Sequence, residues 1–191
     1  MDYFNIYLTG VGGQGIGLLC EVLLRAADNA GLNVKAVDTH GLAQRGGIVV
    51  SRIRIGDKVY SPLIPANEAD LVISLERHEA LRAINIALKN GGTLIYYNTV
   101  WQPLEVRLGS SREVDEETIS QECLRRNIKL IKVIATDLDS VQMQNIALLA
   151  NICKYGLVPG VNIDNYKRAM DDLMEGRMLE ENIKTFDRLR V

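Results

Sequence analysis

The chain has few residues of the kinds that build metal centres. Its three cysteines, Cys20, Cys123 and Cys153, are far apart in the sequence, and no C-x-x-C pair occurs. Such a set supports neither a ferredoxin-like iron–sulfur cluster nor a zinc knuckle. We expect three buried, unreactive thiols in helices. The two histidines, His40 and His78, are too scattered for a metal site or a catalytic triad, so we expect structural roles for both.

Two further classes of function lack support in the composition. The formal net charge is −2, whereas proteins that bind nucleic acid usually carry a clustered basic excess. No apolar run approaches the length that spans a bilayer, and the N-terminus lacks the basic start and apolar stretch of a signal peptide. We therefore expect a cytoplasmic protein that binds neither nucleic acid nor membrane.

The composition is that of a globular protein. Of the 191 residues, 47% are hydrophobic and 24% are charged, which is enough apolar material for one ordinary core. The sequence contains no internal repeat, low-complexity tract or linker. We expect a single domain over residues 1–191.

A glycine-rich turn near the N-terminus is the strongest local signal. Residues 4–9 form a strand-like run and residues 16–30 a helix-like run, and the segment between them reads Gly10-Val-Gly12-Gly13-Gln14-Gly15. Gly10, Gly12 and Gly15 have the G-x-G-x-x-G spacing in the strand–turn–helix context that this pattern requires. The backbone of such a turn, with the helix N-terminus, can hold a phosphate or a carboxylate. It can equally be a tightly packed corner.

Asp38 ends the second expected strand, over residues 33–38. Its distance from the turn is close to that of the ribose-binding carboxylate in dinucleotide-binding folds. The alternative is an aspartate that hydrogen-bonds the next turn.

A second glycine-rich loop follows Asp38 and contains Gln44, Arg45, Gly46 and Gly47. It leaves the carboxyl end of its strand, where open α/β sheets bind ligands, and we expect it on the same sheet edge as the first turn. Arg45 has the geometry to clamp a phosphate or carboxylate. It can instead pair with an acidic residue of another subunit.

The region after this loop departs from a nicotinamide-binding domain. Residues 48–55 alternate as a strand, Gly56-Asp57 predicts a turn, and residues 58–60 complete an expected β-hairpin where a crossover helix normally follows. Alternating strands and helices then resume, with strands over 70–75, 93–97 and 129–135 and helices over 76–89, 115–126, 136–154, 163–175 and 179–189. We predict an α/β, Rossmann-like three-layer sandwich, with a mostly parallel sheet, a β-hairpin insertion and C-terminal helices.

With both glycine loops considered together, the chain resembles the gamma-type subunit of 2-oxoacid:ferredoxin oxidoreductases, most closely the beta subunit of the indolepyruvate branch. The resemblance rests on Gly10-Val-Gly-Gly-Gln-Gly15 and on residues 39–47. Segments 61–65, 68–72, 88–92 and 145–149 support it in family-like order. It extends over nearly the whole chain, and the pairing of the two loops is more specific than either loop alone.

The resemblance implies a reaction that several subunits perform together. In the family, thiamine diphosphate decarboxylates a 2-oxoacid, iron–sulfur clusters pass electrons to ferredoxin, and coenzyme A receives the acyl group. The indolepyruvate branch uses aryl pyruvates. This chain has no Gly-Asp-Gly…Asn-Asn pattern for thiamine diphosphate and Mg²⁺ and no cysteine set for a 4Fe–4S cluster. The resemblance thus places those cofactors in a large alpha subunit, so we expect none firmly bound here and an inactive isolated chain, with self-association left open.

The same reading assigns no catalytic residue to this chain. It assigns a surface toward coenzyme A or the partner subunit to the following residues: Gly10, Gly12, Gly13, Gln14, Gly15, Asp38, Gln44, Arg45, Gly46 and Gly47. Two alternatives remain at this point. One is a stand-alone nucleotide- or flavin-binding module, and the other is a scaffold whose glycine loops only pack.

Overall fold

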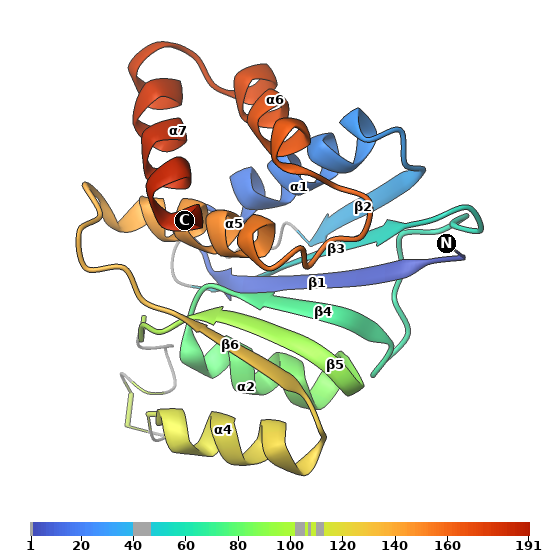
Figure 1. The fold of residues 1–191 in the computed structure, drawn as a ribbon. Helices are drawn as coiled ribbons and strands as arrows, with labels where there is room; N and C mark the ends of the chain where they lie inside the picture. Colours follow the sequence, from blue (N-terminus) through green and yellow to red (C-terminus); the bar gives the residue numbers. More distant parts are fainter. Residues whose placement is uncertain (1, 40–46, 102–105, 107, 110–112) are drawn as a thin grey trace.

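Figure 1 presents the computed structural model of the chain, which describes residues 2–39, 47–101, 106, 108–109 and 113–191. Six strands form one sheet in the order β2-β3-β1-β4-β5-β6. The strands are β1 Phe4–Val11, β2 Val34–Thr39, β3 Ile48–Ile55, β4 Ala69–Ser74, β5 Leu88–Tyr97 and β6 Lys129–Val133. The helices are α1 Ile16–Asn29, α2 Arg77–Ile86, α4 Glu116–Arg125, α5 Gln144–Lys154, α6 Ile163–Leu173 and α7 Gly176–Arg190, with a 3-10 turn η1 Val141–Met143 before α5.

Helices cover both faces of the sheet, which makes three layers. α1, α5, α6 and α7 lie on one face, and α2 and α4 lie on the other (Figure 1). In α1 the buried side chains Leu19, Val22, Leu23 and Ala26 follow helical spacing and face the larger of two apolar clusters. The Rossmann-like fold class is therefore confirmed.

The prediction of a hairpin between residues 48–55 and 58–60 is wrong. β3 pairs antiparallel with β1 on one side and with β2 on the other, and it runs against the other strands of the described sheet. After Gly56 the chain packs on the N-terminus instead of turning back, since Lys58 N–H donates to the Asp2 carbonyl at 3.1 Å. A Cβ at Gly56 would lie 2.6 Å from that same carbonyl oxygen, which explains the glycine without a hairpin turn.

Two helix boundaries also differ from the prediction. The helix expected from residue 136 begins at Val141, because Ser140 has an extended backbone with φ −150° and leads into η1. The helix expected over 76–89 ends at Ile86, and β5 begins at Leu88, so Gly91 and Gly92 belong to a strand. The helix therefore ends several residues before Gly91, and these glycines do not terminate it.

No helix in the described part of the chain combines the length and apolar character that a bilayer crossing requires.

Candidate functional site

The two glycine-rich segments meet at one edge of the sheet. The Gly12 N–H donates to the Gly47 carbonyl over 2.9 Å, and Val11 at the end of β1 pairs with Ile48 at the start of β3. The predicted adjacency therefore holds where the structure describes both segments. Gln44, Arg45 and Gly46 lie outside the described residues.

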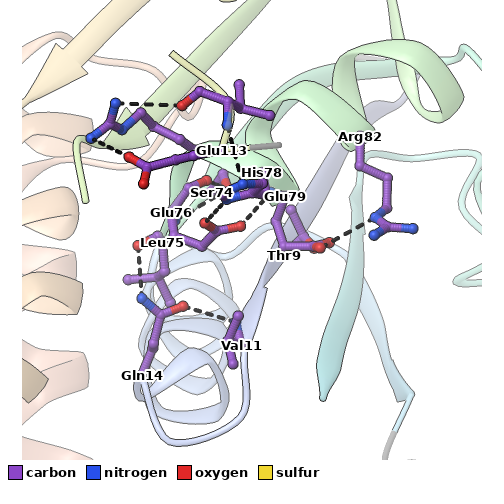
Figure 2. A network of polar contacts seen from close by, with 12 residues as sticks. Thr9, Val11, Gln14, Ser74, Leu75, Glu76, His78, Glu79, Arg82 and Glu113 are labelled. Carbon is purple, nitrogen blue, oxygen red and sulfur yellow. Dashed lines mark hydrogen bonds and ion pairs between the residues drawn. The ribbon is translucent and has the colours of Figure 1, made fainter. Parts of the chain in front are cut away.

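The side chain of Gln14 fixes the shape of the turn from inside. It is 1% exposed; its Oε1 accepts from the Val11 N–H at 2.8 Å, and its Nε2 donates to the Leu75 carbonyl at 2.9 Å. One amide thus joins the end of β1 to the residue that follows β4 (Figure 2). Both ends of this amide are used within the chain, so the Gln14 side chain is not available to a ligand, and Gly13 is the exposed residue of the turn.

Two of the glycines are required by close approach. Gly10 lies in β1, and a Cβ there would come within 2.9 Å of Gln14 Oε1 and of Ile16 Cδ1. Gly15 has a left-handed backbone with φ +80°, and a Cβ there would lie 2.5 Å from Asn145 Nδ2. A larger residue at either position would push against the buried polar groups that hold the turn.

Two helices begin beside each other at this edge. α1 begins after Gly15, and the η1–α5 segment begins after Ser140; neither start has a side-chain cap or an acidic residue in its first turn. Asn145 connects them, since its Nδ2 donates to the Gly15 carbonyl at 3.2 Å. Uncapped N-termini direct backbone N–H groups and positive dipole ends outward, so this edge favours an anion.

An open groove of about 480 Å³ lies next to the junction. Leu18 and Asn145 form its side toward the turn, and Arg177 and Glu181 from α7 form part of the opposite side. Arg177 Nε donates to Glu181 Oε1 at 2.5 Å, so its charge is already paired. The groove therefore offers a mixed surface of apolar, amide and paired charged groups.

Trp101 is the chain's single tryptophan and lies against the turn. Its Cζ3 atom is 3.8 Å from the position that a Cβ at Gly13 would occupy, and Gly13 is exposed with φ +103°. Tryptophan fluorescence is therefore a direct probe of events at the turn.

Behind the turn lies a buried network of charged groups (Figure 2). Glu76 is fully buried and caps α2, accepting from the Glu79 N–H. Its Oε2 lies 3.1 Å from His78 Nδ1, and His78 Nε2 accepts from the Val114 N–H at 3.2 Å. Since Nε2 is an acceptor, Nδ1 carries the proton and donates to the carboxylate. The prediction of a structural role for His78 is confirmed.

Glu79 extends this network to β1. It is 1% exposed; its Oε2 accepts from Thr9 Oγ1 at 3.1 Å, and its Oε1 accepts from Arg82 Nε at 3.2 Å. Burial raises the pKa of this carboxyl, and Arg82 and Thr9 act in the opposite direction. The network joins β1, β4 and α2 below the turn, and it gives the turn a rigid support.

Asp38 lies away from the turn, because β3 separates β2 from β1. Asp38 pairs across the sheet with Ser51, and Ser51 pairs with Leu8. Its carboxylate accepts from the Cys20 thiol at a distance of 3.4 Å. Of the predicted site residues, the structure brings together Gly10, Gly12, Gly13, Gln14, Gly15 and Gly47, and it places Asp38 two strands from β1.

The three thiols do not form a cluster site. Cys20, Cys123 and Cys153 lie in α1, α4 and α5, as predicted, and they are free; Cys20 and Cys123 are buried, whereas Cys153 is half-buried, contrary to the prediction. Burial raises the pKa of Cys20 to about 12 and that of Cys123 to about 11, so both stay protonated and unreactive at neutral pH. These residues do not fit an iron–sulfur cluster. In the described residues, no group of three or more His, Cys, Asp or Glu side chains could hold a metal ion.

The sequence of residues 5–190 matches the family described as pyruvate ferredoxin/flavodoxin oxidoreductase. The chain belongs to this family. Two relatives that align with this chain over most of their length support the assignment. Indolepyruvate oxidoreductase subunit IorB of Archaeoglobus fulgidus is 36% identical, covering 94% of this chain and 90% of the relative. The IorB subunit of Pyrococcus horikoshii is 31% identical, covering 98% and 94%.

Solved oxidoreductases of this kind share the fold. Pyruvate oxidoreductase subunit PORC of Thermotoga maritima superposes with a TM-score of 0.71 at 24% identity, over 100% of this chain and 96% of that one. The 2-oxoglutarate:ferredoxin oxidoreductase of Magnetococcus marinus, with 2-oxoglutarate, coenzyme A and succinyl-CoA bound, gives a TM-score of 0.73 at 19% identity. The match covers 100% of this chain and 31% of that longer chain.

Within this pyruvate ferredoxin/flavodoxin oxidoreductase domain, sequence reasoning missed two contacts. The bond from Asn145 to Gly15 spans 130 positions, and the bond from Thr9 to Glu79 spans 70. No local pattern signals either one. The available sign was a polar residue, Asn145, directly before the apolar run of residues 146–150 in α5.

Proposed function

We propose that this chain is the small subunit of an indolepyruvate:ferredoxin oxidoreductase and is inactive alone. The observation that carries the proposal is the identity to IorB subunits of two organisms over nearly the full length of each chain. The complex would oxidatively decarboxylate indolepyruvate and other aryl pyruvates to aryl-acetyl-CoA, with ferredoxin as the electron acceptor.

The chemistry of this chain supports a division of labour. Thiamine diphosphate, Mg²⁺ and 4Fe–4S clusters would reside in the larger subunit, since the dispersed, protonated thiols here do not suit a cluster. Cofactors supply the decarboxylation and electron-transfer chemistry, and proteins supply binding and orientation. The part left to this chain is to complete the complex and to present the edge of the sheet.

That edge suits the anionic part of coenzyme A. The uncapped start of α1, the exposed Gly13 and the start of η1–α5 direct N–H groups outward at one place. Gly47 adjoins this place through the hydrogen bond to Gly12. The proposed site comprises the backbone of Gly13 and Gly15, with Gln14 as internal support and Gly12 bonded to Gly47 beside it. Arg45, two positions before Gly47 in the sequence, is the candidate cation.

The first experiment is reconstitution. The purified chain is mixed with the larger subunit, and ferredoxin reduction is followed with indolepyruvate, pyruvate or 2-oxoglutarate, with and without coenzyme A. We expect turnover only in the mixture, only with coenzyme A, and fastest with indolepyruvate. Turnover by the isolated chain, or a preference for pyruvate, would contradict the proposal.

The second experiment separates ligand binding from assembly. Arg45→Ala removes a charged hydrogen-bond donor, which is worth about 1.5–3 kcal/mol, or roughly a tenfold to hundredfold loss of coenzyme A affinity. Binding to the complex is followed by Trp101 fluorescence, and subunit association by sedimentation. Arg25→Ala, on the exposed face of α1, is the matched control. If Arg45→Ala weakens association and leaves coenzyme A affinity intact, the loop serves assembly.

A further inference from the structure

On one face of the sheet, β2 and β3 have no covering helix within the described chain. α2 packs on β1, β4 and β5, α4 packs on α2 and β6, and α1 covers β1, β2 and β3 from the opposite face. In Figure 1, α2 and α4 accordingly lie below the β4–β6 half of the sheet, whereas β2 and β3 have a helix only above them. Sheets built mainly of parallel strands are normally covered on both faces.

We call the uncovered surface of β2 and β3 the open face and define it by Lys35, Val37, Val50 and Arg52. The sheet register places these side chains together: Val37 pairs with Arg52, and Arg52 pairs with Tyr7, whose ring faces the α2 side of the sheet. Lys35 is exposed, and Val37, Val50 and Arg52 are half-buried. The open face therefore combines apolar side chains with the cations Lys35 and Arg52, and Arg54 lies directly across from Lys35 on the same face.

The two cations have no carboxylate partner among the described residues. Arg52 lies over the Tyr7 ring, 5.5 Å from its centroid. Among the described residues, neither Lys35 nor Arg52 takes part in an ion pair. The neighbouring cation Arg82 is already paired with Glu79. Charge complementarity at the open face thus requires acidic groups from outside the described chain.

An apolar border adjoins the open face. Arg54 Nη1 donates to the carbonyls of Ser61 and Leu63 at 3.2 Å, which holds the segment that follows β3 against that strand. The Leu63 side chain is 63% exposed. A cleft of about 160 Å³, lined by Tyr7, Arg52 and Ile64 among others, lies between the strands and this segment. For comparison, an apolar cavity of about 150 Å³ takes a benzene-sized group.

We propose that the open face docks an amphipathic helix of the larger partner subunit, with acidic side chains toward Lys35 and Arg52 and an apolar side chain in the cleft. This inference rests on the proposed function, which supplies the partner. A helix is the element that covers every other part of this sheet. The described chain provides none here, and β2 and β3 pair antiparallel, a pairing that does not need the crossover helix of a parallel βαβ unit.

Two matched pairs of variants test the inference in the reconstituted complex. Lys35→Glu on β2 is compared with Lys129→Glu on β6, an exposed lysine on the opposite edge strand. Leu63→Ala is compared with Leu124→Ala on α4, whose side chain is 84% exposed. All four residues are exposed in the isolated chain, so each variant should fold. Folding is checked by circular dichroism.

The readout is the dissociation constant of the two subunits at low and high salt. We expect Lys35→Glu to weaken association about tenfold or more and Leu63→Ala to weaken it severalfold, with both controls equal to wild type. Added salt should reduce wild-type affinity and shrink the effect of Lys35→Glu.

Each other outcome overturns the inference. Unchanged affinity in both test variants would exclude the open face as the docking surface. If the test variants lose a self-association that the isolated wild-type chain shows, and still bind the larger subunit, the open face would be an interface with a second copy of this chain. Failure of the wild-type subunits to associate would refute the proposed function itself, and this result is distinguishable because it does not depend on any substitution.

Discussion

Two glycines separated by one residue should respond to alanine with opposite signs. Gly15 has φ +80°, and an added Cβ would lie 2.5 Å from Asn145 Nδ2, whereas a Cβ at Gly17 would meet nothing within 4 Å. In Gly15→Ala, the left-handed backbone costs about 1–2 kcal/mol, and a displaced Asn145 loses a hydrogen bond worth about 0.5–1.5 kcal/mol. The lower entropy of the unfolded chain returns about 0.4–1 kcal/mol.

The net expectation for Gly15→Ala is a loss of about 2 kcal/mol in the free energy of unfolding. For a chain of this size, about 2–4 °C of melting temperature corresponds to each kcal/mol. Gly17→Ala should instead stabilise the chain by about 0.5–1 kcal/mol, because alanine is the better residue in a helix. Urea unfolding followed by circular dichroism measures both.

The double variant Gly15→Ala/Asn145→Ala tests the cause of the loss. If the clash with Asn145 contributes, the two substitutions together should cost less than the sum of the single costs. Equal effects of alanine at positions 15 and 17 would refute the reasoning.

Three further results are expected. Gln14→Glu should lower the free energy of unfolding by about 2 kcal/mol at pH 7, since an ionised carboxylate cannot donate to the Leu75 carbonyl. Gln142→Glu, exposed in the uncapped first turn of η1, should instead stabilise the chain by about 0.3–1 kcal/mol. Glu79 has a pKa raised above its ordinary value of 4.5, so its contribution to stability is present below that value and is lost as pH rises through the folded pKa. As the pH is raised above 4.5, the urea midpoint of the wild type should therefore fall, and that of Glu79→Gln should fall less. Asn162→Ala removes the capping box of α6 and should cost about 1 kcal/mol in thermal unfolding.

Local patterns were sufficient for most of the fold. The alternation of strands and helices, the glycine turn and the start of α1 at Ile16 follow from hydrophobic period and glycine spacing, and the structure confirms them. The neighbours of β3 could not be predicted in this way. Its alternating pattern indicates a strand, but Gly56-Asp57 suggested a local partner, and the real partners are β1 and β2.

At the candidate site, the sequence predicts the proximity of the two glycine segments but not the long-range contacts that support them. The proximity of the two glycine segments follows from the rule that strand ends share a sheet edge, and the Gly12–Gly47 hydrogen bond confirms it. The internal support of the turn is non-local. Gln14 reaches Leu75, and Gly15 is contacted by Asn145 from another helix, so neither contact leaves a local signature.

The insertion of β3 also bears on the nucleotide-binding alternative. In a dinucleotide-binding fold, the glycine turn and the ribose-binding carboxylate follow adjacent strands of the sheet. Here β3 lies between β1 and β2, which adds one strand spacing of about 4.8 Å between Gly15 and Asp38. The Asp38 carboxylate accepts from the Cys20 thiol, and the uncapped start of η1–α5 lies beside the turn through Asn145. The polar groups at this edge are thus helix N-termini and glycine backbone, an arrangement that would suit a phosphate better than a ribose.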